Sequence, residues 1–234
     1  MINLRNNFKK SALAFVFAGF FSLSFNANAG AYEDFFAAIL RDNPGNLQTL
    51  LRRGVDANTP SPEGQRGLTM ALAAESMKAA EVLINWPKTD VNALNRKGES
   101  PLMLAAIKGN KDVAEQLIKK GADVNKTGWT PLHYAASSGQ LAVISLLLDQ
   151  HAYIDAESPN GTTPLMMAAM YGTGEAVNLL LAEGADAQLK NQQGKTALDF
   201  ALSLFLCLSL SLSFFLSLSL SLSFSLSLSL SASV

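Results

Sequence analysis

Cysteine and histidine are scarce in this chain of 234 residues, which contains one cysteine and two histidines. Cys207 has no second cysteine with which to form an intramolecular disulfide or to complete a zinc site. His133 and His151 have no partner at the spacing of metal ligands. We therefore expect no bound metal.

Catalytic motifs are also missing from the sequence. There is no G-x-S-x-G nucleophile elbow, and Gly64-Gln65-Arg66-Gly67 lacks the lysine and the spacing of a phosphate-binding loop. We therefore expect no catalytic residues, no cofactor and no enzymatic activity.

The first 29 residues have the composition of a secretory signal. A basic start precedes an apolar run, Ala12–Phe21, and the small residues Ala27-Asn28-Ala29 follow. The run is shorter than the ~20 residues that span a bilayer, which argues against the alternative of a membrane-anchoring helix. We predict cleavage after Ala29 and a bacterial periplasmic protein; an exported eukaryotic protein is the alternative.

Positive charge is not in excess after this cleavage. Three of the 18 basic residues lie in the signal, so 15 remain against 19 acidic residues and the net charge is near −4. A nucleic-acid-binding domain normally carries a basic surface, so nucleic acid is not an expected partner.

What the chain does contain is one phrase in several copies. The clear copies are Ser100-Pro101-Leu102-Met103-Leu104-Ala105-Ala106, Thr130-Pro131-Leu132-His133-Tyr134-Ala135-Ala136 and Thr163-Pro164-Leu165-Met166-Met167-Ala168-Ala169. Taking looser copies to begin at Thr69 and Thr196, the gaps between copies are 31, 30, 33 and 33 residues. A period of this size indicates stacked repeats.

Each unit predicts a pair of helices. Thr130 can cap the first helix, Pro131 suits its first turn, and Gly139 can end it. The apolar residues of 143–148 then form one face of a second helix. A single unit cannot bury its own apolar faces, so neighbouring units must cover them.

These residues resemble the ankyrin-repeat family over about Tyr32 to Ala201. The resemblance implies an all-α ankyrin-repeat solenoid of stacked helix pairs with hairpin-like finger loops. The expected domains are the signal peptide (1–29), the repeats (30–202) and a low-complexity tail (203–234). The repeats would comprise a degenerate N-terminal pair, about four full units and a truncated last unit.

Two units depart from the pattern. The unit counted from Thr69 reaches Lys88 in 19 residues, against 21 in the next three, which predicts a clipped second helix that ends at Trp86-Pro87. The loop between Val124 and Thr130 is three residues shorter than its counterpart in the next unit, which predicts a stunted finger.

Residues 203–234 are almost strictly alternating serine and leucine. This period favours a β-strand, disorder or aggregation, and a C-terminal membrane anchor is the alternative. We expect membrane contact only through this tail.

The resemblance also indicates which residues would contact a protein partner, namely the finger loops and the pair after each Ala-Ala. Those positions are Leu94, Arg96, Lys97, Glu99, Ile107, Lys108, Trp129, Ser137, Ser138, Glu157, Asn160, Thr162, Met170 and Tyr171. Trp129 and Tyr171 are candidate anchors, because aromatic residues dominate many interfaces; the alternative is that they pack on adjacent loops and helices. His133 is expected to bond nearby backbone or threonine groups and to be structural.

The leading hypothesis is thus a non-enzymatic protein-binding scaffold or regulator of a periplasmic partner. The alternatives are a membrane-attached structural protein held by the tail, and an inhibitor or immunity-type partner of a secreted or periplasmic enzyme.

Overall fold

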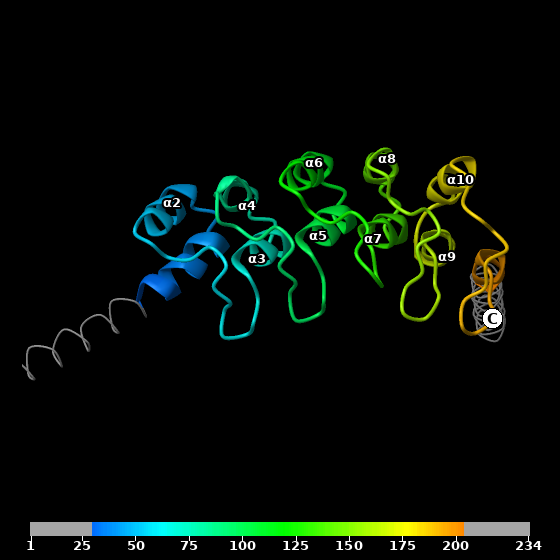
Figure 1. Ribbon diagram of the computed structural model, residues 1–234, viewed down its shortest axis with the longest axis horizontal. Helices are drawn as coiled ribbons and strands as arrows, with labels where there is room; N and C mark the ends of the chain where they lie inside the picture. The colour runs from blue at the N-terminus through cyan, green and yellow to red at the C-terminus, as the bar shows by residue number, and fades with distance from the viewer. Residues whose placement is uncertain (1–29, 204–234) are drawn as a thin grey trace, which may run out of the picture. The chain divides into compact units, whose positions relative to one another are not determined.

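The computed structural model describes residues 30–203, so the predicted signal peptide (1–29) and all of the tail after Ser203 lie outside the described residues (Figure 1). The described part is helical and contains no β-strand; one isolated β-bridge joins Pro60 to Arg66. This confirms the predicted all-α class. Between residues 30 and 203, no helix combines the length and the apolar composition that a bilayer crossing requires.

The helices occur in pairs. The first pair is formed by residues 30–40 and α2 (Pro44–Arg52). The next four pairs are α3 (Gly67–Ala73) with α4 (Met77–Asn85), α5 (Pro101–Ile107) with α6 (Lys111–Lys119), α7 (Pro131–Ser137) with α8 (Leu141–Asp149), and α9 (Pro164–Tyr171) with α10 (Gly174–Ala182). Residues 197–203 are helical again.

The spacing of these helices corrects one of our expectations. In each of the four pairs from α3 to α10, the second helix begins ten residues after the first and is nine residues long. Helix α4 therefore has full length, and the prediction of a clipped second helix was wrong.

The error arose because the start of the first repeated phrase was placed at the wrong residue. Thr69 is not the residue before the helix; that place belongs to Arg66, and Thr69 is the third residue inside α3. The Thr69 hydroxyl accepts a hydrogen bond from the Arg66 amide at 3.3 Å. Arg66 and Gly67 replace the usual Thr-Pro, so the nearest threonine was mistaken for the start of the phrase.

The chain divides into two compact units. Unit 1 comprises the residues up to Leu104 together with Gln116–Ala122, and unit 2 comprises Ala105–Glu115 together with the residues from Asp123 onward. The division runs through α5 and α6.

Unit 1 has an aromatic and aliphatic core. Phe35 and Ile39 from the first helix, Leu47 from α2 and Leu83 from α4 are fully buried. Helices α2 and α4 lie side by side (Figure 1). The Asp42 carboxylate accepts a hydrogen bond from the Ala79 amide at 2.8 Å, which satisfies an unpaired donor in the first turn of α4. This pair of helices is thus joined by packing and by a cap.

Unit 2 repeats the arrangement with an aliphatic core. Helices α7 and α9 lie side by side, as do α8 and α10 (Figure 1). Leu132, Ile144, Leu147 and Leu180 are fully buried. Asn125 joins two successive loops: its amide nitrogen donates to the His151 carbonyl at 2.8 Å, and its amide oxygen accepts from the Tyr153 amide at 2.8 Å.

Four of the finger loops have the same hydrogen-bonded tip. In each, a serine or asparagine side chain accepts from the amide four residues later, as Ser158 does from Thr162 at 2.9 Å. A glycine with positive φ stands three residues after that serine or asparagine, as Gly161 does at 73°. The four tip residues are Ser61, Asn95, Ser158 and Asn191.

The loop 124–130 has no counterpart of that tip residue. The three positions that the sequence lacks include the place of Ser158, although Gly128 keeps the positive φ at 83°. This explains in structural terms the shorter finger that the sequence predicted, and it leaves Trp129 in a different kind of loop.

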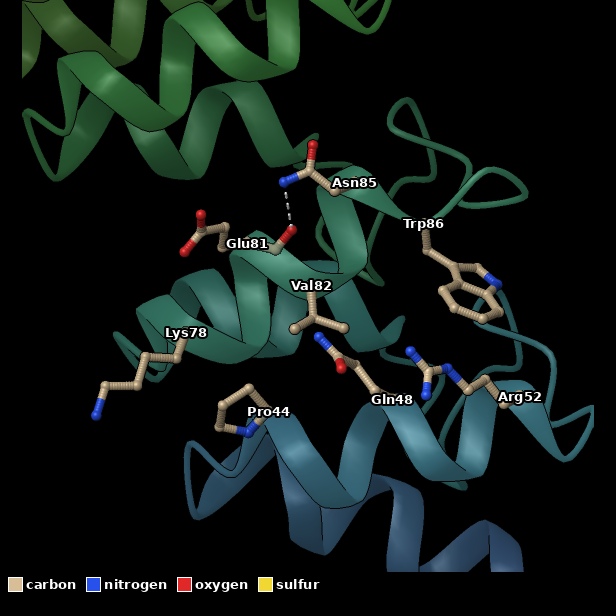
Figure 2. Close-up of a pocket in the computed structure, with 8 residues that line it drawn as sticks. All are labelled: Pro44, Gln48, Arg52, Lys78, Glu81, Val82, Asn85 and Trp86. Atoms are coloured by element: carbon tan, nitrogen blue, oxygen red, sulfur yellow. Dashed lines mark hydrogen bonds between the residues drawn. The ribbon is translucent and has the colours of Figure 1, made fainter.

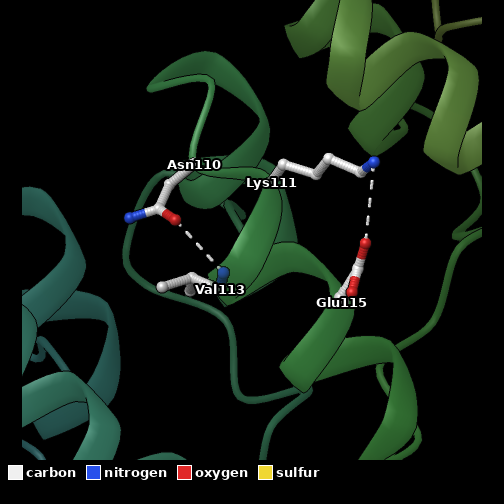
Figure 3. Close-up of polar contacts among 4 residues, drawn as sticks. All are labelled: Asn110, Lys111, Val113 and Glu115. Carbon is white, nitrogen blue, oxygen red and sulfur yellow. Dashed lines mark hydrogen bonds and ion pairs between the residues drawn. The ribbon is translucent and has the colours of Figure 1, made fainter.

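The start of α6 shows how the polar ends of these helices are satisfied. The Asn110 side-chain oxygen accepts a hydrogen bond from the Val113 amide at 3.1 Å, and Lys111 Nζ lies 3.8 Å from Glu115 Oε1 (Figure 3). The lysine and glutamate are four residues apart and partly exposed, so their pairing contributes about 0.3–0.5 kcal/mol.

Candidate protein-binding surface

The predicted contact residues fall into two groups. Leu94, Arg96, Lys97 and Glu99 belong to unit 1, and the ten others in the predicted set belong to unit 2.

In unit 2, three successive first helices end with the same kind of pair. After two alanines, the chain presents Ile107-Lys108, Ser137-Ser138 and Met170-Tyr171, which we call the exposed pairs. Ile107 is 38% exposed directly after the buried Ala106, and Tyr171 is 63% exposed three residues after the buried Ala168. The register of the repeat thus places these six side chains at the end of the first helices, at or near the surface.

The serines of the middle exposed pair are bonded to their own helix. The Ser137 and Ser138 hydroxyls each donate to the Tyr134 carbonyl at 2.9 Å. Their oxygens keep acceptor capacity, because a hydroxyl has two lone pairs. The middle pair is therefore small, ordered and polar between two pairs that contain larger apolar side chains.

Trp129 packs partly within the protein. It is half-buried, and its ring meets the His133 imidazole edge-on, with 5.3 Å between ring centres. Part of this aromatic surface is thus used in holding the shortened loop. Of the two predicted aromatic anchors, Tyr171 has the larger exposed fraction.

The loop residues at 157–162 have different environments. Glu157 is exposed, and so is Asn160, whose side-chain oxygen accepts from the Ser158 hydroxyl at 2.5 Å. Thr162 is only 5% exposed. Its carbonyl oxygen accepts from His133, so Thr162 holds the loop and its side chain is not presented to a partner.

In unit 1, two of the four predicted residues also stabilise their own loops, and Leu94 is 41% exposed. The Arg96 guanidinium donates to the Pro62 carbonyl at 2.9 Å, which joins two finger loops. Glu99 accepts from the Asn95 side chain at 2.7 Å. Lys97 is exposed. The basic character that we expected at this place is therefore divided between a structural arginine and an exposed lysine.

His133 has the structural role that the sequence predicted. It is fully buried; Nε2 lies 2.8 Å from the Thr162 carbonyl, and Nδ1 lies 2.8 Å from the Thr130 hydroxyl. A carbonyl only accepts, so Nε2 carries the proton and Nδ1 accepts from Thr130. Burial lowers the pKa of His133 below 6.5, and this effect outweighs the bond to Thr162, which acts in the opposite direction.

The place of His133 in the repeat takes several kinds of side chain. In four repeats, the side chain of the third residue of the first helix accepts a hydrogen bond from the backbone amide of the residue just before that helix. The accepting atom is an oxygen in Thr69 and Asp199, the sulfur in Met103 and a nitrogen in His133. No single chemistry is required there. This place is therefore a cap, and it is not a candidate catalytic site.

The structure also shows surface features that the sequence analysis did not include. Tyr153 is 69% exposed, and only its backbone amide is engaged in the bond to Asn125. Its place in a turn was visible in the sequence, but its large exposure was not. The corrected phase of the first units also assigns Leu40-Arg41 and Ala73-Ala74 to the positions of the exposed pairs in unit 1.

A cavity of about 480 Å³ lies between α2 and α4 in unit 1 (Figure 2). Its walls combine the Trp86 and Val82 side chains with the charged residues Arg52, Lys78 and Glu81. Among residues 30–203, no cluster of three or more histidine, cysteine, aspartate or glutamate side chains could hold a metal ion.

Comparison with known proteins gives a consistent result. The family model described as ankyrin repeats (three copies) matches residues 35–127, 68–158 and 150–207. The chain is 32% identical over 113 residues to mouse (Mus musculus) protein fem-1 homolog A-like, and 35% identical over 118 residues to a putative palmitoyltransferase, ZDHHC13, of Danio rerio. It is 34% identical over 112 residues to the neurogenic locus notch homolog protein 1 of Xenopus tropicalis.

These three similarities cover 47%, 48% and 47% of this chain, but only 17%, 18% and 4% of the respective relatives. The chain therefore spans less than a fifth of the length of these relatives, and their names describe much longer proteins. The family model, in contrast, covers most of this chain. The chain belongs to the ankyrin-repeat family, whose repeats generally serve as non-enzymatic protein-interaction modules.

Proposed function

We propose that this protein is an exported scaffold or regulator that binds a periplasmic protein through the exposed pairs of unit 2. The observation that carries the proposal is the exposure of Ile107, the first residue of its pair, and of Tyr171, the second residue of its pair, in helices whose alanines Ala106 and Ala168 are buried. Apolar and aromatic side chains at such places favour a protein partner, because they gain most from being covered. Met170 beside Tyr171 can adapt to an irregular partner surface.

The partner that fits this surface has an apolar patch with polar groups opposite the central serines. Ser137 and Ser138 can accept hydrogen bonds there, and Lys108 adds positive charge near Ile107. Trp129 and Lys97 are secondary candidates: the first is half-buried and the second lies in unit 1. The periplasmic location is supported by the composition of residues 1–29.

The test uses two matched pairs of variants. Tyr171→Ala is compared with Tyr153→Ala, because the two tyrosines have similar exposed fractions, 63% and 69%. Ile107→Ala is compared with Leu141→Ala, whose parent residues are 38% and 39% exposed. Each mature variant is used to capture proteins from a periplasmic extract. Loss of one captured protein with Tyr171→Ala and Ile107→Ala, but not with the two controls, supports the proposal.

The same experiment separates the proposed roles. Equal capture by all four variants would exclude the exposed pairs as the binding surface. If the captured protein is an enzyme whose activity falls on binding, the regulator is an inhibitor or an immunity-type partner. If the chain is recovered with carbonate-washed membranes and captures nothing, a structural protein attached by the tail is favoured over a scaffold.

A further inference from the structure

The last repeat has an open apolar groove. It lies between α9, α10 and the helix 197–203, all within unit 2, and has a volume of about 680 Å³. Most of its wall is apolar. The apolar residues that line it are Leu165, Ala168, Ala169, Val177, Leu181, Ala187, Ala197, Leu198 and Ala201.

The same places are covered in the other repeats. The second residue of the first helix is a leucine in five repeats, and Leu68, Leu102, Leu132 and Leu165 are all buried. Leu198 is 65% exposed. The alanine three residues later is also buried in those four repeats, whereas Ala201 is exposed. The groove is therefore the place where a second helix covers the first in every preceding pair.

We propose that this groove is occupied by the beginning of the chain's own Ser-Leu tail, within residues 204–216. The register of the four preceding pairs would start a second helix at Cys207, ten residues after the helix that begins at 197. Ala201 in the wall of the groove lies two residues before Ser203, the last described residue, and 31 further residues follow Ser203. A segment tethered so closely has an effective concentration in the millimolar range, so even a weak contact is populated.

The composition of the tail suits the groove. Residues 204–216 carry no charge, and all their even positions are leucine or phenylalanine. In a helix, residues four apart lie on one face, so a helix at 204–216 would carry Leu208 and Leu212 on one apolar stripe. Serines between them can bond backbone carbonyls a turn earlier, which satisfies their hydroxyls where they are covered.

The fit differs from that of an ordinary second helix. The seventh residue of α4, α6, α8 and α10 is a leucine that is completely buried: Leu83, Leu117, Leu147 and Leu180. In strict register that place in the tail falls on Ser213, and a leucine reaches it only if the segment shifts by one residue. The tail therefore acts as a substitute for the second helix, with Leu208 and Leu212 in the groove.

The experiment measures how accessible the groove is in the full chain. Leu198→Cys is combined with Cys207→Ser, so that one thiol reports on the groove, and its rate of modification by an aromatic disulfide reagent is followed. Two tail variants, each of which replaces three leucines and one phenylalanine by serine, are compared with the unaltered tail. The near variant changes Leu208, Leu210, Leu212 and Phe214, and the far variant changes Leu220, Leu222, Phe224 and Leu226.

We expect the thiol in the near variant to react at least about tenfold faster than with the unaltered tail, and the far variant to leave the rate unchanged. Ser145→Cys, an exposed site on α8 away from the groove, should react equally in all three. Hydrogen exchange supplies a second measurement: amides of 197–202 should lose protection only in the near variant, while those of α8 keep theirs.

Two results would overturn the proposal. Equal rates and equal exchange in the near and far variants would show that the tail does not enter the groove. Protection that rises with protein concentration would assign the groove to a second copy of the chain instead. Neither result bears on the exposed pairs. The groove proposal and the proposed function can therefore be refuted separately.

Discussion

Leu132 and Leu198 are the same residue at the same place in two repeats, yet Leu132 is completely buried and Leu198 is 65% exposed. Local sequence does not explain the difference, since both stand one residue after the start of a short first helix. What differs is the cover: α8 follows α7, whereas the described residues end at the helix 197–203. Burial in a repeat protein is thus a property of the neighbour as much as of the residue.

The largest expected effect tests this difference directly. Leu132→Ala should reduce the free energy of unfolding by about 3 kcal/mol, the usual cost of a cavity at a fully buried leucine. Leu198→Ala, made in the near variant of the tail so that the groove is open, should change it by about 0.5 kcal/mol or less, as at an exposed position. Urea unfolding of the two full-length variants gives both values. Equal losses would mean that the groove is already covered as completely as the interior.

A smaller effect is expected at His133, the third residue of the first helix in its repeat. His133→Ala would leave the Thr162 carbonyl and the Thr130 amide without their partner, at a cost of about 1–3 kcal/mol. His133→Met should reduce the free energy of unfolding by less, because Met103 fills the equivalent buried position and its sulfur accepts a hydrogen bond from the Ser100 amide. Thermal unfolding of both variants would measure the difference; a methionine variant as unstable as the alanine variant would argue against the cap role.

The buried imidazole also predicts a pH dependence. The pKa of His133 in the folded protein is below its usual 6.5, so between these two values the unfolded chain binds more protons than the folded protein. Stability is therefore fully present above pH 6.5 and falls as the pH is lowered through that window. His133→Met should remove this slope. The free energy of unfolding measured from pH 7.5 down to 5 would show it, and identical slopes in both proteins would contradict the assignment.

The smallest expected effect concerns His151, two residues after the end of α8 at Asp149. His151 has a φ of +61°, and the equivalent residues Gly121 and Gly184 have φ values of +88° and +95°. A side chain is strained there, so His151→Gly should stabilise the protein by about 0.5–1 kcal/mol. His151→Ala keeps the strain and serves as the control. A glycine variant no more stable than the alanine variant would show that the strain is relieved elsewhere.

The fold was predictable because most of its determinants are local. The Thr-Pro start at Thr130, the paired alanines and the loop glycines each carry their own backbone preference, and their period identified the helix pairs. The start of a repeat was predicted wrongly only at Arg66 and Gly67, which replace the usual threonine and proline. There the Thr69 side chain, within the helix, accepts the hydrogen bond from the Arg66 amide.

The contact surface was less predictable because exposure depends on partners distant in sequence. Thr162 belongs to a finger loop, but a bond from His133, 29 residues earlier, removes it from the surface. Arg96 is exposed yet bonds the Pro62 carbonyl in the preceding loop. Neither bond follows from composition or period, because each depends on how the neighbouring loops lie within their unit.

The central claim is that place in the repeat decides which exposed side chains bind a partner. Calorimetric titration of the captured partner with the Tyr171→Ala and Tyr153→Ala variants tests it, because the two tyrosines occupy different positions in the repeat but have similar exposed fractions. We expect Tyr171→Ala to weaken binding at least tenfold, about 1.4 kcal/mol, and Tyr153→Ala to leave the affinity unchanged. Equal affinities in the two variants, or a loss confined to Tyr153→Ala, would contradict it.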